Sequence, residues 1–367
     1  MNVIDKMIGV FSPRLAYERM SWRSELERNF NSAKPSRLPQ NFRPAIGDAE
    51  TINKGSRDRL RAIARNLENN SDISESVVTT FERNVIGSGI TLQIKSDDEV
   101  FNKKVETLFK EWSSPSNCEV TGGLSFLDVQ NIIMRRLIYD GGILIKKVID
   151  KSASIPFKLQ LIEVDELDKS VQVKNNTTRC FDGVEVNLQN KPIKYHIKKY
   201  DWAGISTSSE AIEAKDIIFL RRLKRSSQIR ELSEIARTID RISSTDEYLV
   251  SVAEKERVAA CFAAFIKKNT PSGAGLGRTG GGAKTSDSGA PLKNITPGMI
   301  QYLSPGEEAT VISPNGQASD TEKFVRTQIR LLSSGVGLSY ETVARDLSQV
   351  NYSSARQNLL EDKETYK

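Results

Sequence analysis

Clustered carboxylates and a lone histidine are the first residues in this sequence that could do chemistry. Glu163, Asp165 and Glu166 stand close together, and two-metal nucleases hold their ions with such acids. We find no second set of acids to complete a metal site, so a solvated turn is the better interpretation. A metal-dependent DNA-processing enzyme that uses these acids with Asp140 is kept as the alternative. His196, the only histidine, lies in a strand-like run and predicts a structural side chain.

A glycine-rich segment, residues 271–291, imitates two nucleotide-binding motifs without completing either. Gly275, Gly277 and Gly280 form GxGxxG, but no strand precedes them and no helix follows. A P-loop requires glycine where Ala283 stands, because its backbone amides must closely approach the phosphates. The composition predicts a flexible loop and no nucleotide cofactor.

The cysteines and the apolar runs exclude other classes of protein. Cys118, Cys180 and Cys261 are far apart, which argues against a disulfide framework and a zinc site and predicts free thiols. No run of about 18 apolar residues occurs, so no membrane span is expected. The N-terminus lacks the pattern of a secretion signal, so a cytoplasmic location is the default expectation.

Positive charge is concentrated near the N-terminus. The whole chain has a net charge of +6, and residues 1–70 hold 13 Lys and Arg against 8 Asp and Glu, a net +5. Pro35, Pro39 and Pro44 disfavour regular structure, so residues 1–50 are predicted to form a basic extended arm that could touch an acidic partner.

Spacing of apolar residues then predicts helices followed by mainly antiparallel strands, which is an α+β class. Ser71 is the expected N-cap of the first of these helices. The helices are expected at about 71–86, 98–112 and 124–139, and the strands at 142–149, 157–163, 183–188, 192–199 and 216–222.

Two long helices are predicted in the second half. Residues 231–257 have a narrow apolar seam interrupted by Asp246 and would form a rod of roughly 40 Å. Residues 318–334 carry Lys323, Arg326 and Arg330 on one stripe, although residues 319–367 hold seven cations and seven acids. Such a stripe is also ordinary for a solvated helix face.

The polar run VNYSSAR, residues 350–356, precedes the last helix. Asn351, Ser353 and Ser354 are expected to cap it, because their side chains accept hydrogen bonds from free amides. From the residues alone, the chain is an elongated, oligomeric α+β protein without catalytic machinery.

An ordered set of motifs over about residues 50–367 resembles the portal proteins of tailed phages, the lambda-type family. The most specific stretch is GLSYETVARDLSQVNYSSAR. Departures occur at Phe219, Ser227 and Glu231, where the family has histidine and glycines, and at Lys367, where portals usually continue into a crown that we expect to be absent here. The matching stretches are residues 64–93, 135–147, 159–168, 182–197, 217–235, 297–315 and 337–356.

The resemblance implies a portal fold with an α/β wing, long stem helices and a small β-containing clip. It assigns 1–50 to the arm, 51–230 to the wing, 231–257 to stem helix 1, 258–317 to the clip with its loop 271–291, 318–334 to stem helix 2, 335–352 to a tunnel loop and 353–367 to the start of a tunnel helix.

The implied function is structural, with no enzyme activity and no cofactor or metal. About twelve copies would form a ring at one capsid vertex, and double-stranded DNA would pass through it without sequence readout during packaging and ejection. Implied partners are the large terminase subunit, the major capsid and scaffolding proteins, and head-completion or connector proteins. The location would be the virion, and the host cytoplasm during assembly. A non-channel DNA-binding adaptor is a further alternative.

The resemblance also places residues in roles. The DNA-channel lining would comprise Lys323, Arg326, Arg330, Gln349, Asn351, Tyr352 and Arg356. The motor- and connector-docking clip would use Lys284, Lys293, Gln301 and Glu307. Packing between subunits at the stem would use Ile235, Ile239, Ile242 and Leu249.

Overall fold

The computed structural model describes residues 46–173, 177–204, 206–261, 265–268, 307–310 and 318–366. The contacts divide the chain after Asp48, and the fold below is that of the unit beginning at Ala49. The predicted arm up to residue 45 and the loop 271–291 lie outside the described residues. Ala49 and Glu50, which the arm was predicted to include, instead begin a helix.

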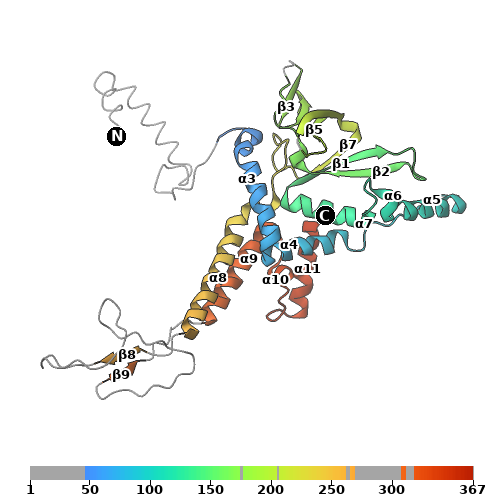
Figure 1. The fold of residues 1–367 in the computed structure, drawn as a ribbon. Coiled ribbons are helices and arrows are strands. Elements are labelled where there is room, and N and C mark those ends of the chain that lie inside the picture. The colour runs from blue at the N-terminus through green and yellow to red at the C-terminus, as the bar shows by residue number, and fades with distance from the viewer. Residues whose placement is uncertain are drawn as a thin grey trace, which may run out of the picture. The chain divides into compact units, whose positions relative to one another are not determined.

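The described chain begins with a layer of helices, and the three helices predicted from the sequence are confirmed (Figure 1). Ser71 caps α4 by accepting from the Ser74 amide, as predicted, and α4 continues into a π-helical turn. Ser125 and Asp128 form a capping box at the start of α7. The bounds are α3 Ala49–Asn70, α4 Asp72–Phe81, α5 Glu99–Trp112, α6 Pro115–Cys118 and α7 Phe126–Tyr139, with the π-helical turn at Glu82–Ile86.

Two antiparallel sheets follow, so the predicted α+β class is confirmed. One has the strand order β2-β1-β7 and the other β3-β4-β5-β6. The sequence missed β3 and β6; β6 reads STSSEAIE, which has few apolar residues to reveal alternation. The bounds are β1 Gly142–Ile149, β2 Phe157–Ile162, β3 Thr178–Phe181, β4 Val184–Asn187, β5 Pro192–Tyr200, β6 Ser206–Glu213 and β7 Ile217–Arg221.

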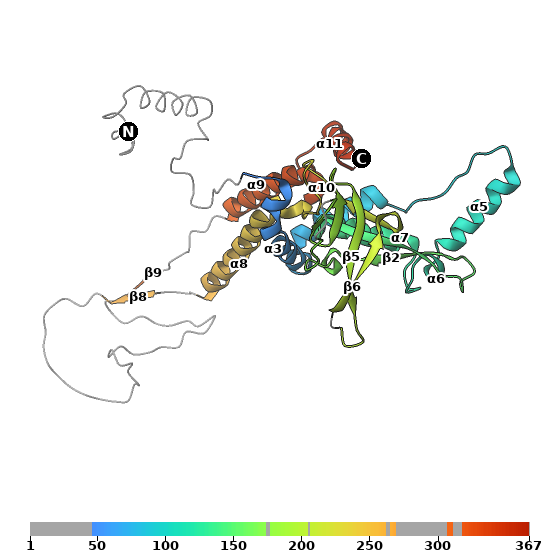
Figure 2. The same cartoon turned by 90° about the horizontal axis from the view of Figure 1, so that it is seen from above.

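Two long helices lie side by side in both ribbon views (Figures 1 and 2). The rings of Tyr248 and Phe324 join them, with centroids 4.4 Å apart. Between these helices in sequence, β8 pairs antiparallel with β9. No helix within the described ranges has the length and apolar character needed to cross a bilayer. The bounds are α8 Ile239–Cys261, β8 Phe265–Lys268, β9 Glu307–Thr310, α9 Ala318–Val336, α10 Tyr340–Ala344 and α11 Tyr352–Tyr366.

The first long helix begins later than predicted. Residues 231–238 do not form an α-helix. Glu234–Arg237 form a 3-10 turn, and α8 starts at Ile239. The reason is that Glu231 and Ser233 are committed to other elements: the Glu231 carbonyl accepts from Arg57 Nε at 3.2 Å, and Ser233 Oγ donates to the Ile138 carbonyl at 3.2 Å.

A glycine after α7 lets the 228–233 segment approach closely. Gly141 has φ +86°, and a Cβ there would lie 2.3 Å from the carbonyl carbon of Leu232. A side chain at this position would therefore collide with backbone, which cannot move aside as a flexible side chain can.

We expect Gly141→Ala to destabilise the fold strongly. Gly122→Ala is the matched control, since Gly122 has φ +73° and no atom within 4 Å of its added Cβ. The control should cost only the left-handed strain, about 1–2 kcal/mol, and Gly141→Ala about 2–3 kcal/mol beyond it. Urea unfolding curves of both variants measure this, and equal reductions in stability would contradict the close approach.

Candidate functional site: a charged helix face and its buried anchor

The predicted cationic stripe of α9 is divided between exposed and engaged side chains. Lys323 is exposed and has no carboxylate partner among the described residues. Arg326 contacts Glu322 at 3.0 Å and Asp346 at 3.5 Å. Arg330 is exposed and has its guanidinium 5.2 Å from the centre of the Tyr340 ring. Only part of the stripe is therefore available to a ligand.

Asp346 joins the segment after α10 to this face. It accepts from the Tyr340 hydroxyl at 3.0 Å and from the Ser348 amide at 3.0 Å. Hydrogen bonds from Ser348 and Tyr340, together with Arg326, lower the pKa of Asp346 to about 2. Burial and the bond to Asp346 raise the pKa of Tyr340. The carboxylate is therefore charged at neutral pH.

Most residues of the VNYSSAR stretch face solvent. Asn351 accepts from the Ser354 amide at 2.9 Å and so caps α11, as predicted. Ser353 and Ser354 lie inside α11, so their predicted capping role is wrong. Gln349, Tyr352 and Arg356, the remaining predicted lining residues, lie at or near the surface, with Tyr352 82% exposed.

A contact that the sequence did not reveal fixes α10 against α11. The carboxylate of Asp362, only 3% exposed, accepts from the Ser339 amide at 2.8 Å and from the Thr342 hydroxyl at 2.6 Å. Asp362 stands 23 residues after Ser339, so no local pattern predicts the pairing.

Of the residues predicted for the motor- and connector-docking clip, one belongs to a described element. Lys284, Lys293 and Gln301 lie outside the described residues, and Glu307 begins β9.

The predicted stem-packing residues also divide into buried and exposed side chains. Ile235, Ile239 and Ile242 are at most 3% exposed, in a core shared with α4, α7 and α9. This chain therefore already covers these three side chains, and their packing between subunits stays a prediction. Leu249, at 37% exposed, stays available for that role.

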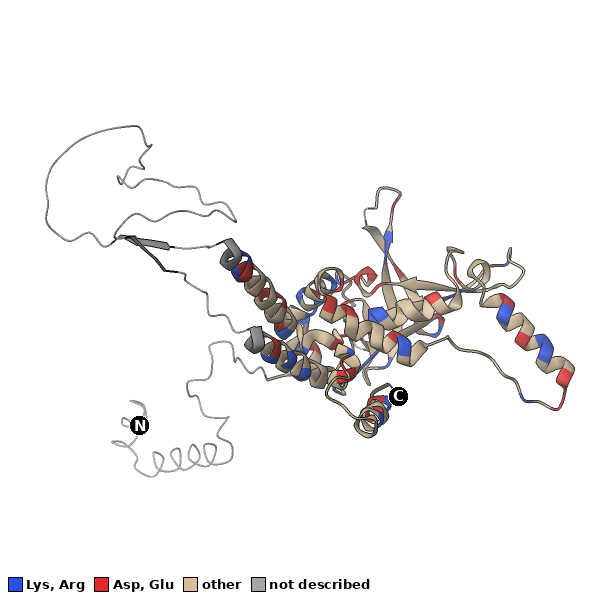
Figure 3. Cartoon of the chain, turned by 90° about the horizontal axis from the view of Figure 1, so that it is seen from below, with Lys and Arg blue, Asp and Glu red and all other residues tan. Residues whose placement is uncertain are grey.

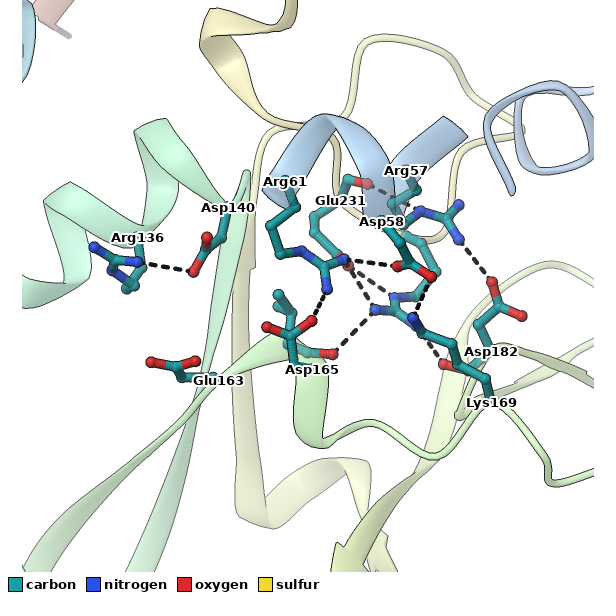
Figure 4. Close-up of polar contacts among 12 residues, drawn as sticks. Arg57, Asp58, Arg61, Arg136, Asp140, Glu163, Asp165, Lys169, Asp182 and Glu231 are labelled. Atoms are coloured by element: carbon teal, nitrogen blue, oxygen red, sulfur yellow. Dashed lines mark hydrogen bonds and ion pairs between the residues drawn. The ribbon is translucent and has the colours of Figure 1, made fainter. Parts of the chain in front are cut away.

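A buried carboxylate anchors the segment that leads into α8 (Figure 4). Glu231 is 0% exposed and accepts from Arg230 Nε at 2.8 Å, Arg230 Nη2 at 2.8 Å and Arg61 Nη2 at 2.8 Å. Arg57, also buried, binds Glu50 at 2.6 Å and Asp182 at 2.8 Å. These contacts tie α3 to the 228–233 segment and to the turn between β3 and β4.

Of the acids considered for a nuclease, Glu163 and Asp165 lie at the exposed edge of this network, whereas Asp140 is buried. Arg65 binds Asp140 at 2.8 Å, Glu163 at 3.0 Å and Asp165 at 2.6 Å. Asp165 also contacts Arg61. The hydrogen bond to Asp140 contributes most to raising the pKa of Arg65. Within the described part of the chain, no group of three His, Cys, Asp or Glu residues is placed to hold a metal ion.

The remaining chemical candidates have structural surroundings. His196 lies in β5, as predicted, with Nε2 3.1 Å from a Glu185 oxygen. Cys118 and Cys180 are free thiols, and burial raises the pKa of each. Neither is placed as a reactive nucleophile, because a raised pKa keeps the thiol protonated.

We expect the buried anchor to make stability depend on acid. Burial alone would raise the pKa of Glu231, but Arg230 and Arg61 outweigh it and lower the pKa from 4.5 to about 2. A carboxyl group with a lowered folded pKa stabilises above pH 4.5 and loses that contribution as pH falls towards 2, on the order of 3 kcal/mol.

Glu231→Gln should cost about 3–5 kcal/mol at pH 7, because it leaves two buried arginines without their carboxylate. It should also flatten the decline in stability between pH 4.5 and 2. Glu256→Gln, an exposed position on α8, is the control. Urea unfolding across pH measures both, and a variant with wild-type stability and acid response would refute the anchor.

Comparison with known proteins agrees with the resemblance seen in the sequence. The model of the lambda family of phage portal proteins matches residues 36–367. A probable portal protein of Halomonas phage phiHAP-1 is 25% identical over 362 residues, covering 93% of this chain and 68% of the relative. Portal protein B of Escherichia phage lambda is 19% identical, covering 81% of this chain and 62% of the relative.

The fold also resembles a solved assembly. A chain in the neck of an empty gene transfer agent particle superposes with a TM-score of 0.50 at 12% identity, covering 86% of this chain and 76% of that one. This likeness supports the fold. Since the family model spans nearly all of the sequence, the chain belongs to the lambda family of phage portal proteins.

Proposed function

We propose that copies of this chain form a ring at one vertex of a phage capsid, through which double-stranded DNA is packaged and later ejected. The observation that carries the proposal is the family match over residues 36–367. The fold relative belongs to a particle neck computed with C6 symmetry, which supports a cyclic assembly, and the number of about twelve subunits is what the family resemblance implies. The chain spans about two thirds of the length of its relatives, 68% and 62%.

The helix pair α8–α9 suits the wall of a DNA channel. Both helices carry cations and acids along their surfaces (Figure 3). Copies of Lys323 and Arg330 around a ring would contact backbone phosphates in whatever orientation the duplex passes. Such contacts do not depend on the base sequence. Interspersed acids such as Glu322 would keep the attraction weak enough for DNA to slide.

Partners follow from the family role. The clip, residues 258–317, would dock the large terminase subunit and later the head-completion or connector proteins. The wing would meet the major capsid and scaffolding proteins. The location would be the virion, after assembly in the host cytoplasm. ATP hydrolysis would belong to the terminase, so this chain would act as a structural part without an enzyme activity of its own.

The enzyme alternative has little support from the geometry. Asp140, Glu163 and Asp165 each contact arginine, so their charges are already compensated. A metal ion would have to displace these guanidinium groups. Metal-dependent DNA cleavage that disappears in Asp165→Ala would nevertheless favour the alternative.

We expect Lys323→Glu/Arg330→Glu to weaken DNA binding while leaving assembly intact. Both side chains are exposed, so the fold should tolerate the change. The salt dependence of duplex binding should fall by about one unit of log–log slope for each phosphate that the variant no longer neutralises, and packaging should be impaired. Arg326 is left unchanged because it holds Asp346.

Lys103→Glu, an exposed position on α5, is the matched control and should behave like wild type. Duplex binding at several salt concentrations and packaging in a complementation assay provide the readouts. A double variant that binds and packages DNA normally would remove the α9 face from the channel.

A further inference from the structure

The segment 345–350, between α10 and α11, is bonded to the other elements described here through one side chain. Within this segment, and among the residues that the structure describes, only Asp346 has a side-chain bond to another element. Its partners are Arg326 on α9 and Tyr340 on α10. The backbone at Arg345 adopts a left-handed φ of +53°, which disfavours a non-glycine residue. Leu347 is 62% exposed and adds little packing.

The cation that holds Asp346 stands on the face proposed to meet DNA. Arg326 lies one helical turn from both Lys323 and Arg330. Its ion pair with Asp346 is partly exposed, at 26% for the arginine side chain and 28% for the carboxylate, and spans 3.5 Å. A partly exposed pair of this kind is weak. The two non-bridging oxygens of a DNA phosphodiester can bind a guanidinium group in two-pronged geometry, whereas Asp346 makes a single 3.5 Å contact with Arg326.

We propose that Asp346 is a latch that fixes the 345–350 segment to α9, and that DNA phosphate opens it by drawing Arg326 away. The inference rests on the proposed function, since it requires duplex DNA beside α9. In the closed state, Arg326 and the Tyr340 hydroxyl hold the carboxylate. Once Arg326 turns to a phosphate, Asp346 keeps only Tyr340 and its own Ser348 amide, and the segment becomes free to move.

Arg330 couples the same event to α10. Its guanidinium lies over the Tyr340 ring, whose hydroxyl binds Asp346. A phosphate that attracts Arg330 therefore weakens the second support of the latch as well. Asp362, which binds Ser339 and Thr342, keeps the start of α10 in place, so the motion should be confined to residues after Ala344.

Hydrogen–deuterium exchange of peptides covering 345–351 in the full chain tests the closed latch without DNA. Asp346→Asn and Tyr340→Phe should each speed exchange roughly fivefold, the effect of removing one ion pair or one hydrogen bond. Glu322→Gln is the control, because it removes the other carboxylate bound to Arg326 and leaves Asp346 in place. Wild-type exchange in Asp346→Asn would overturn the latch.

Adding a short duplex of arbitrary sequence tests the opening, with binding followed by fluorescence anisotropy. Exchange of 345–351 should speed up severalfold in wild type and stay unchanged in Arg326→Gln, where the latch is already open. Bound DNA that slows the segment, or leaves it unchanged, would overturn the opening step. A wild-type chain that binds no duplex would refute the proposed DNA contact and with it the opening, whereas the variants without DNA still report on the closed latch.

Discussion

The fold depends on one buried carboxylate held between two arginines. Glu231 has no solvent contact, and Arg230 and Arg61 supply three hydrogen bonds to it at 2.8 Å. A carboxylate can stay charged at such depth only if its partners are fixed in place. The 228–233 segment is consequently fastened to α3, and Gly141 gives it room to pass α7. Because α8 begins shortly after this segment, the anchor sets where the long helix pair leaves the body of the protein.

The sequence predicted elements whose signals are local. Alternation located five strands within a few residues, and Ser71 and Asn351 were identified as caps because a cap is a matter of a few neighbouring residues. The polar strand β6 was missed since its pairing with β5, and not its composition, makes it a strand. The family and the α+β class were also predictable, because ordered motifs survive at low identity.

Contacts between distant residues could not be predicted. Arg61 lies 170 residues before Glu231, so the anchor has no signal in the sequence around either residue. Ser227 and Glu231 stand where the family pattern has glycines and weakened the resemblance there, yet the structure uses both: the Ser227 hydroxyl accepts from the Ala49 amide at 3.0 Å. The apolar seam of residues 231–257 was predicted to pack against neighbouring subunits, whereas Ile235 and Ile242 contribute to the core of this chain.

The charged residues of α9 also make a distant contact that the sequence could not predict. Spacing placed Lys323, Arg326 and Arg330 on one face, which the structure supports, but it could not show that Arg326 binds an acid 20 residues further along. The cationic stripe is thus partly exposed to solvent and partly an internal support.

We propose that copies of the chain close into a ring whose channel is faced by α9. Cryo-electron microscopy of the purified full chain tests it most directly. We expect closed rings with a central channel, and maps in which Lys323 and Arg330 of every subunit point towards the axis. A protein that stays monomeric at all concentrations, or a ring in which α9 faces outward, would contradict it.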